Sequence, residues 1–377
     1  MPGLLPEIDP EGLLEFSVVF TDRSLNHMSA RFQQAMRDIS KTLKEVYHAQ
    51  AVAIVPGGGS YGMEAVARQF AHGKNVLVVR NGWFSYRWTQ IFEAGQIPET
   101  VAVLKARPVS EAPQSAYAPA PIAEVLAHIH QQRPDLVFAP HVETASGMLL
   151  PDDYLRQVAD ATHAVGGLFV LDCIASGTLW VDMQACGVDI LISAPQKGWS
   201  STPCAAMVMF SEAALAQMEK TTSSSFAGDL KKWRQIMLAY ENGGHAYHAT
   251  MPTDGLLQLR DTMQELRDWG FDRAKEAQLE LGRRVRALLE ARGFHSVAAA
   301  GFHAPGVIVS YTQDDGIKSG TKFIAAGLQT AAGVPLQCDE PEGTNFKTFR
   351  IGLFGLDKLQ NIERTVSHLE RALDALR

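Results

Sequence analysis

The sequence has 377 residues, more than the roughly 250 to 300 at which one hydrophobic core stops growing, so two domains are expected. Hydrophobic residues make up 46% and charged residues 20%, which is ordinary globular usage and excludes a disordered or fibrous chain. The net charge of −7 leaves no broad positive field, so we expect no nucleic acid as a partner.

The first half of the chain predicts one large sheet. Residues 1–20 have no clear period and are expected to form an N-terminal arm. From residue 51, short apolar runs alternate with longer amphipathic stretches, as in parallel strands joined by helices that cover both faces. The expected strands span residues 51–55, 75–79, 100–104, 135–139, 168–172, 189–193 and 205–210. The predicted fold class is α/β, with a mainly parallel seven-stranded sheet in a large domain over residues 21–254.

The second half changes to long helical patterns. We expect helices at residues 255–269, 271–292, 316–332 and 357–376, with short strands at 306–311 and around 349–353. These elements predict a smaller C-terminal α+β domain over residues 255–377.

Neither a membrane anchor nor a metal site is expected. No apolar run approaches the roughly 18 residues of a spanning helix, and residues 1–12 lack the basic start and apolar middle of a secretory signal. The four cysteines, Cys173, Cys186, Cys204 and Cys338, show no C-x-x-C spacing. We therefore expect a cytoplasmic protein with no membrane partner and with free, buried thiols.

A glycine-rich turn, PGGGSYG at residues 56–62, follows the first expected strand and opens a helix. Such a turn can bind an anion, because its backbone N–H groups are unpaired and the helix dipole favours negative charge. Many α/β turns, however, need glycine only for backbone geometry. The turn alone therefore leaves phosphate binding and a purely structural role both open.

Two charged residues follow neighbouring strands. Asp172 ends the fifth expected strand, and Lys197 comes just after the sixth, where burial of its charge is costly unless the amine is paired or covalently engaged. An isolated Asp at such a place is often only a helix cap. Together with the glycine-rich turn, however, the pair supplies what pyridoxal phosphate requires: a Schiff-base lysine, a carboxylate for the ring nitrogen and a phosphate cradle.

The order of these motifs, with HVETASG at residues 141–147, resembles fold-type I pyridoxal-phosphate enzymes, specifically class V aminotransferases, from about Arg31 to the C-terminus. Gln196 before Lys197 is similar to the alanine:glyoxylate and serine:glyoxylate branch, whereas cysteine desulfurases typically have His-Lys there.

The resemblance implies a role for each matching residue. Lys197 would hold the cofactor, and Asp172 would face its ring nitrogen. Phe84 matches the aromatic position that stacks on the ring, although the neighbouring Trp83 is an alternative. Thr144 would bond to the phenolic oxygen of the ring, and Ile174 would cover the ring face opposite the aromatic residue. The residues implied to contact the phosphate are Gly58, Gly59, Ser60 and Gln196.

The resemblance also implies contacts beyond one subunit's cofactor pocket. Tyr247 and Thr250 would contact the phosphate of the other subunit, which implies a homodimer with shared active sites. Arg350 matches the arginine that grips the substrate carboxylate, a task that suits its planar fork. Two departures are that the arm lacks the family's usual Gly-Pro loop and that Ala249 stands where the family usually has His.

The expected function is transfer of an amino group from a small amino acid, alanine or serine-like, to a keto acid such as glyoxylate or pyruvate by ping-pong kinetics. The alternative within the fold is a lyase or cysteine desulfurase, for which Cys338 is the candidate nucleophile. Its neighbours Asp339 and Glu340 would raise the thiol pKa and argue against that role. A non-catalytic binding module is the alternative of another class.

Overall fold

The computed structural model describes residues 13–340 and 346–376. Of the expected N-terminal arm, residues 1–12 lie outside the described residues. Residues 13–29 contain no helix or strand, and the first helix, α1 (Ala30–Tyr47), begins at the N-cap Ser29, whose side chain accepts the N–H of Phe32.

The seven expected strands form one sheet, as predicted, in the order β1-β11-β10-β9-β6-β2-β3. β11 pairs antiparallel with both β1 and β10, while the other neighbours are parallel. The carboxyl ends of the six remaining strands therefore lie along the same edge. Their bounds are β1 (Ala51–Pro56), β2 (Asn75–Arg80), β3 (Thr100–Lys105), β6 (Leu136–Pro140), β9 (Leu168–Asp172), β10 (Ile190–Ser193) and β11 (Ala205–Phe210).

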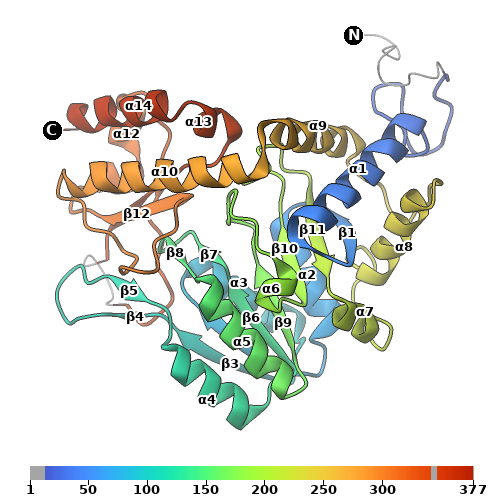
Figure 1. The fold of residues 1–377 in the computed structure, drawn as a ribbon, viewed down its shortest axis with the longest axis horizontal. Helices are drawn as coiled ribbons and strands as arrows, with labels where there is room; N and C mark the ends of the chain where they lie inside the picture. Colours follow the sequence, from blue (N-terminus) through green and yellow to red (C-terminus); the bar gives the residue numbers. More distant parts are fainter. Residues whose placement is uncertain (1–12, 341–345, 377) are drawn as a thin grey trace.

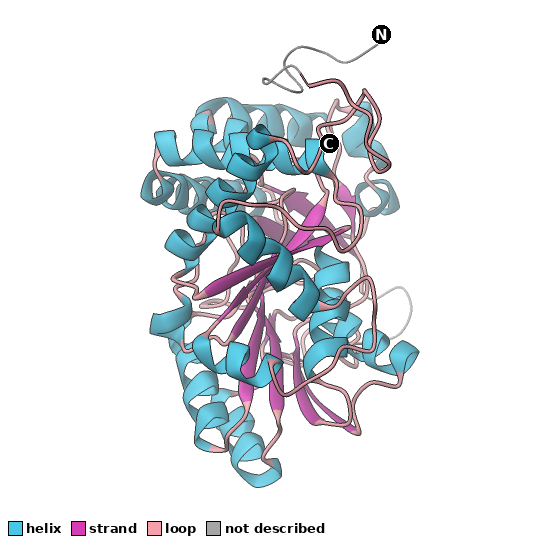
Figure 2. Cartoon of the chain, turned by 90° about the vertical axis from the view of Figure 1, so that its right-hand side faces the viewer, coloured by secondary structure: helices cyan, strands magenta, loops and turns pink. Residues whose placement is uncertain are grey.

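Helices cover both faces of this sheet, which explains why its central strands are continuously apolar (Figure 2). Every residue of β6, β10 and β11 is buried, whereas the edge strand β3 is partly exposed. Besides α1, the helices of the large unit are α2 (Gly59–Phe70), α3 (Trp83–Gly95), α4 (Ile122–Gln132), α5 (Asp152–Ala164), α6 (Met183–Cys186), α7 (Glu212–Met218), α8 (Leu230–Glu241) and α9 (Thr253–Trp269).

A second unit surrounds a three-stranded antiparallel sheet in the order β12-β14-β13, drawn in orange and red in Figure 1. Its strands are β12 (Val307–Tyr311), β13 (Ala331–Ala332) and β14 (Thr348–Gly352), and its helices are α10 (Phe271–Glu290), α11 (Asp315–Ser319), α12 (Thr321–Ala325), α13 (Leu356–Gln360) and α14 (Ile362–Ala375). Two short pairs complete the strands: β4 (Arg107–Pro108) with β5 (Tyr117–Ala118), and β7 (Val142–Glu143) with β8 (Met148–Leu149).

Two helix predictions in this unit were wrong. The expected helix at residues 316–332 is two short helices and a strand, because Gly320 takes a left-handed conformation with φ of +81° between them. The expected helix at residues 357–376 is interrupted at Asn361, which lies between α13 and α14.

The buried apolar side chains form one large cluster around the seven-stranded sheet and a smaller one around α10, β12, β14 and α14. Two further clusters are smaller still, and one of them joins β12 to Tyr117 and Met148. Leu256, Leu259, Met263 and Leu266 of α9 belong to the large cluster, while the smaller cluster begins at Leu281 on α10. The predicted boundary between residues 254 and 255 stays a prediction. Within the described residues, no helix has the length and apolar character needed to cross a membrane.

Candidate active site

A cavity of about 200 Å³ lies at the carboxyl edge of the large sheet, where the loops after β1, β9 and β10 meet. It brings together eight of the predicted site residues, namely Gly59, Ser60, Phe84, Thr144, Asp172, Ile174, Gln196 and Lys197. The remaining lining residues are Met63, Arg87, Val142 and Ala175. Residues from five separate segments of the sequence thus share one small space.

The glycine-rich turn needs glycine for its backbone geometry, which is one of the two roles that the sequence left open. Gly57 has a φ of +120°, and a Cβ there would lie 2.6 Å from the ring of Tyr61. A Cβ on Gly59 would lie 2.4 Å from Cδ1 of Ile174, so the backbone can approach Ile174 only without a side chain. Gly58 is the N-cap of α2 and has no side chain to accept the first N–H groups of the helix. The start of α2 therefore faces the cavity as an uncapped, positively polarised helix end.

Asp172 is a buried carboxylate whose Oδ1 accepts the N–H of Ile174 at 2.9 Å. Burial raises the pKa of Asp172 to about 7, and the nearby Glu143 adds to the rise, whereas Arg87 and Lys197 oppose it. Within the described part of the chain, no cation forms a salt bridge with it. Its negative charge would be stabilised by a cationic group placed in the cavity.

Lys197 lies at the same end of the cavity, on the loop that follows β10. Burial lowers the pKa of Lys197, the nearby Arg350 lowers it further, and Asp172 opposes both effects. Its Nζ lies 5.0 Å from the ring centroid of Phe354. The site thus holds an amine that is costly to keep charged, as a nucleophile or general base requires.

Phe84 supplies the aromatic wall of the cavity. The guanidinium carbons of Arg87 and Arg350 lie 5.2 Å and 5.5 Å from its ring centroid. Trp83, the alternative, packs 5.8 Å from the ring centroid of Tyr86 and does not line the cavity. This arrangement favours Phe84 as the residue that stacks on a bound ring.

Glu143 fixes the start of the helix that carries Phe84. Its buried carboxylate accepts the N–H of Phe84 at 3.2 Å, the N–H of Ser85 at 2.8 Å and the hydroxyl of Ser85 at 2.7 Å. It also accepts the N–H of Ala145 at 2.9 Å. These bonds give Glu143 a structural role at the start of α3.

His141 also has a structural contact. Its Nδ1 lies 2.7 Å from Oγ of Ser176. Complete burial lowers its pKa to about 4, so the ring is neutral at physiological pH.

Four predicted residues lie outside the cavity lining, namely Gly58, Arg350, Tyr247 and Thr250. Arg350, on β14, donates from Nε to the carbonyl of Ala332 at 2.8 Å and reaches toward Phe84. Tyr247 and Thr250 are exposed, and their hydroxyl oxygens lie 3.1 Å apart. Neither residue lines the cavity of its own subunit, and both are accessible to another subunit.

Sequence reasoning missed several residues around the cavity. Arg87 follows Phe84 by three residues on α3, and Met63 follows Ser60 by three residues on α2. Residues three apart lie on the same face of a helix, so this spacing is the signal that could have identified Arg87 and Met63. Phe354, which faces Lys197, follows Arg350 by four residues but lies in a loop after β14, where no periodicity points to it.

The lining fits pyridoxal phosphate. The uncapped start of α2 suits a phosphate, Phe84 and Ile174 offer apolar contact to a ring, and Asp172 suits a protonated ring nitrogen. Oε1 of Gln196 is buried without a hydrogen-bond partner, although buried polar atoms are almost always paired. A ligand with a hydrogen-bond donor near Gln196 would satisfy that atom.

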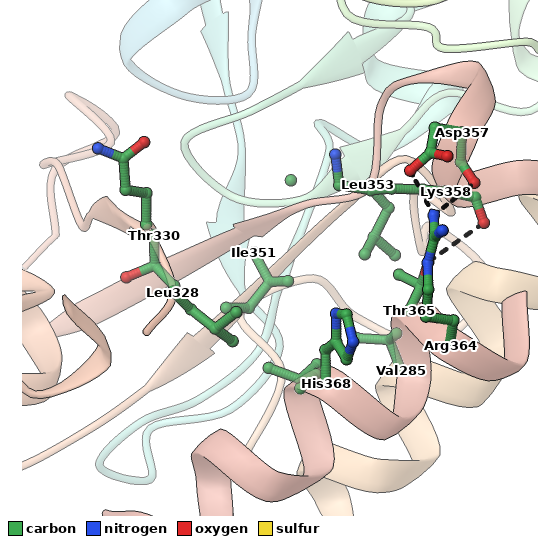
Figure 3. Close-up of a pocket in the computed structure, with 13 residues that line it drawn as sticks. Val285, Leu328, Thr330, Ile351, Leu353, Asp357, Lys358, Arg364, Thr365 and His368 are labelled. Atoms are coloured by element: carbon green, nitrogen blue, oxygen red, sulfur yellow. Dashed lines mark hydrogen bonds and ion pairs between the residues drawn. The ribbon is translucent and has the colours of Figure 1, made fainter. Parts of the chain in front are cut away.

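A larger pocket, of about 370 Å³, lies in the small unit between α10, α14 and β14 (Figure 3). Its lining includes the apolar side chains of Val285, Ile351 and Leu369, and Arg364, another lining residue, donates a hydrogen bond to Asp357. None of the predicted site residues lines it. Residue chemistry therefore identifies the smaller cavity as the candidate active site.

The sequence matches the family profile Aminotransferase class-V over residues 15–325. It is 25% identical over 364 residues to the alanine–glyoxylate aminotransferase of Oryctolagus cuniculus, a match that covers 93% of this chain and 86% of that protein. It is 27% identical over 276 residues to the L-aspartate–glyoxylate aminotransferase of Paracoccus denitrificans, covering 72% and 66%. The fold matches the crystal structure of an alanine–glyoxylate aminotransferase from Nostoc sp. with a TM-score of 0.75 and 21% identity, over 93% of this chain and 89% of that one. Since the profile spans most of the chain, the protein belongs to the aminotransferase class V family and is a pyridoxal-phosphate-dependent transaminase.

Proposed function

We propose that the enzyme moves the amino group of a small amino acid, alanine or serine-like, to a keto acid such as glyoxylate or pyruvate, with ping-pong kinetics. The observation that carries the proposal is the cavity that joins Asp172, Gln196 and Lys197, with Arg350 reaching toward its aromatic wall. The relatives named as alanine–glyoxylate and L-aspartate–glyoxylate aminotransferases support this substrate class.

Two side chains would carry the proton transfers. When bound, pyridoxal phosphate supplies a ring that withdraws electrons from the substrate's α-carbon. Because burial lowers the pKa of Lys197, a larger share of its amine is uncharged at neutral pH and able to accept the α-proton. Asp172 would hold a proton on the ring nitrogen, since a carboxylate beside that nitrogen stabilises its charged form.

Arg350 would orient the substrate. Its guanidinium can bind a carboxylate with two parallel hydrogen bonds, which fixes the position of the α-carbon. In the structure it keeps one bond to the Ala332 carbonyl, and its guanidinium lies over the ring of Phe84. A carboxylate bound there would lie at the cavity mouth, within reach of the Lys197 loop.

The lyase or desulfurase alternative requires a mobile nucleophilic cysteine. Cys338 is 4% exposed, and burial raises the pKa of its thiol to about 12, with further rises from Glu143 and Glu340. The other three cysteines are also free and buried, as expected from the sequence. These observations favour transamination over sulfur chemistry.

Assembly and location stay proposals. The homodimer proposal is that Tyr247 and Thr250 of each subunit contact the phosphate bound in the other, and their exposure on the surface supports it. A cytoplasmic location stays a prediction from the sequence.

A sequential absorbance experiment tests the proposed reaction. The visible band of the bound cofactor is recorded, alanine, serine or aspartate is added, and then glyoxylate or pyruvate follows. We expect the band to disappear with a donor and return with an acceptor, because the amino group rests on the cofactor between the two half-reactions. A persistent band with release of ammonia or sulfide would contradict the proposal and favour the lyase.

A further inference from the structure

Arg87 is a cavity residue that the assigned roles leave unexplained. It lies on α3, and its Nη1 donates to Oγ of Ser60, in the first turn of α2, at 2.7 Å. Its guanidinium carbon also lies 5.2 Å from the ring centroid of Phe84. The guanidinium therefore stands between the uncapped helix start and the aromatic wall.

The charges of the cavity indicate what the Arg87 guanidinium could do at this position. Among the twelve lining residues, the cations are Arg87 and Lys197, and Asp172 is the acid. A phosphate monoester carries about −1.5 to −2 charges near neutral pH, and a helix start offers only about half a positive charge. The Lys197 amine is committed to the reacting end of the cofactor, so compensation of the phosphate falls to Arg87.

The Arg87 guanidinium also has N–H groups that remain available for a ligand. Arginine carries five N–H groups in a planar fork, and in the described hydrogen bonds Arg87 uses only Nη1, toward a hydroxyl that could rotate to serve the same phosphate. We infer that Arg87 binds the cofactor phosphate together with Ser60 and the start of α2, and so supplies the positive charge of the phosphate site. This inference rests on the proposed placement of the phosphate at Gly58, Gly59 and Ser60.

The competing explanation is that Arg87 only clamps α3 to α2 through Ser60. The two roles differ in which ligands bind more weakly after Arg87 is substituted. Loss of a phosphate contact weakens binding of pyridoxal phosphate but not of pyridoxal, which lacks the phosphate. Loss of a clamp distorts the cavity and weakens both ligands alike.

The test compares the dissociation constants of both ligands for cofactor-free wild type, Arg87→Gln, Arg87→Lys and the control Arg68→Gln, by absorbance titration. Arg68 also donates to a serine hydroxyl, that of Ser224, but lies outside the cavity lining. We expect Arg87→Gln to weaken pyridoxal phosphate by about tenfold to a hundredfold, the usual loss for a hydrogen bond to a charged group, and to leave pyridoxal unchanged. Arg87→Lys should recover part of the loss, and Arg68→Gln should match wild type.

A second probe uses no part of the reaction. Inorganic phosphate should compete with pyridoxal phosphate for the wild-type protein and compete more weakly for Arg87→Gln. Equal weakening of pyridoxal and pyridoxal phosphate, or no change in either, would overturn the role of Arg87 while leaving the transaminase intact. Failure of the wild type to bind pyridoxal phosphate better than pyridoxal would instead overturn the proposed phosphate site itself.

Discussion

At the scale of single residues, Asp172 makes the stability of the cofactor-free protein depend on pH. Its pKa rises from 3.8 to about 7 on folding, so between these values the folded state holds a proton that the unfolded state releases. The stabilisation is complete below pH 3.8 and is lost as pH rises toward 7. Each pKa unit corresponds to about 1.4 kcal/mol, so the loss is on the order of a few kcal/mol.

We therefore expect Asp172→Asn to flatten this part of the stability curve and to make the cofactor-free protein more stable than wild type above pH 7. Urea unfolding at a series of pH values measures the effect. Asp153→Asn, at an exposed position on α5, is the control and should follow the wild-type curve. Parallel curves for Asp172→Asn and wild type would show that Asp172 is not buried as described.

The proposed role of Arg350 as the anchor of the substrate carboxylate predicts a selective kinetic defect. Arg350→Gln should lower kcat/KM for amino acid donors by roughly tenfold to a hundredfold, because a charge-assisted bond to the carboxylate is lost. Simple amines without a carboxylate should be affected much less. Steady-state kinetics with alanine and with a primary amine make the comparison, and near-equal losses would point to a different carboxylate anchor. Since Nε also holds the Ala332 carbonyl, circular dichroism should confirm that the variant folds.

At the scale of elements, the large sheet was predictable because its strands are buried on both faces. Continuously apolar runs such as AVAIV in β1 and LFVLD in β9 are typical of interior strands. Asp172 ends one of these runs, and Lys197 follows another. The small unit was harder, because Gly320 and Asn361 break patterns that look continuous in the sequence. The site was predicted only in part, because the sequence did not single out Arg87, which lines the cavity, or Phe354, whose ring lies near Lys197.

The loop after β10 packs closely against the loop after β9, a contact that cannot be read from the sequence. A Cβ on Gly198 would lie 1.9 Å from the carbonyl oxygen of Gly177, so the loop of Lys197 and the loop after β9 touch through their backbones. Gly198→Ala should destabilise the protein by roughly 1 to 3 kcal/mol, as overpacking does, and should displace Lys197. Thermal unfolding and cofactor retention during dialysis measure the two effects.

A matched glycine substitution supplies the control for the loop. Gly244 meets only an ordinary contact at 3.6 Å, so Gly244→Ala should leave both stability and cofactor retention near wild type. Unchanged stability of Gly198→Ala would mean that the two loops can separate freely.

At the scale of the whole molecule, the active site draws on both units. The cavity lies at the edge of the large sheet, but Arg350 and Phe354 come from β14 and the loop that follows it. The same loop is tied to the Lys197 loop, because the N–H of Leu356 donates to Oγ of Ser200 at 2.8 Å. The segment that follows Arg350 and the loop of Lys197 are thus joined by a direct hydrogen bond between the units.

The proposed dimer can be tested by mixing two inactive variants. Lys197→Ala damages the site of its own subunit, whereas Tyr247→Ala combined with Thr250→Ala would damage only the site of the other subunit. In a mixed dimer one site then carries both defects and the other carries none, so activity should return when differently tagged variants are co-expressed and the mixed species is purified. Activity that stays at the level of the separate variants would mean that Tyr247 and Thr250 serve their own subunit, because each site would then keep one defect.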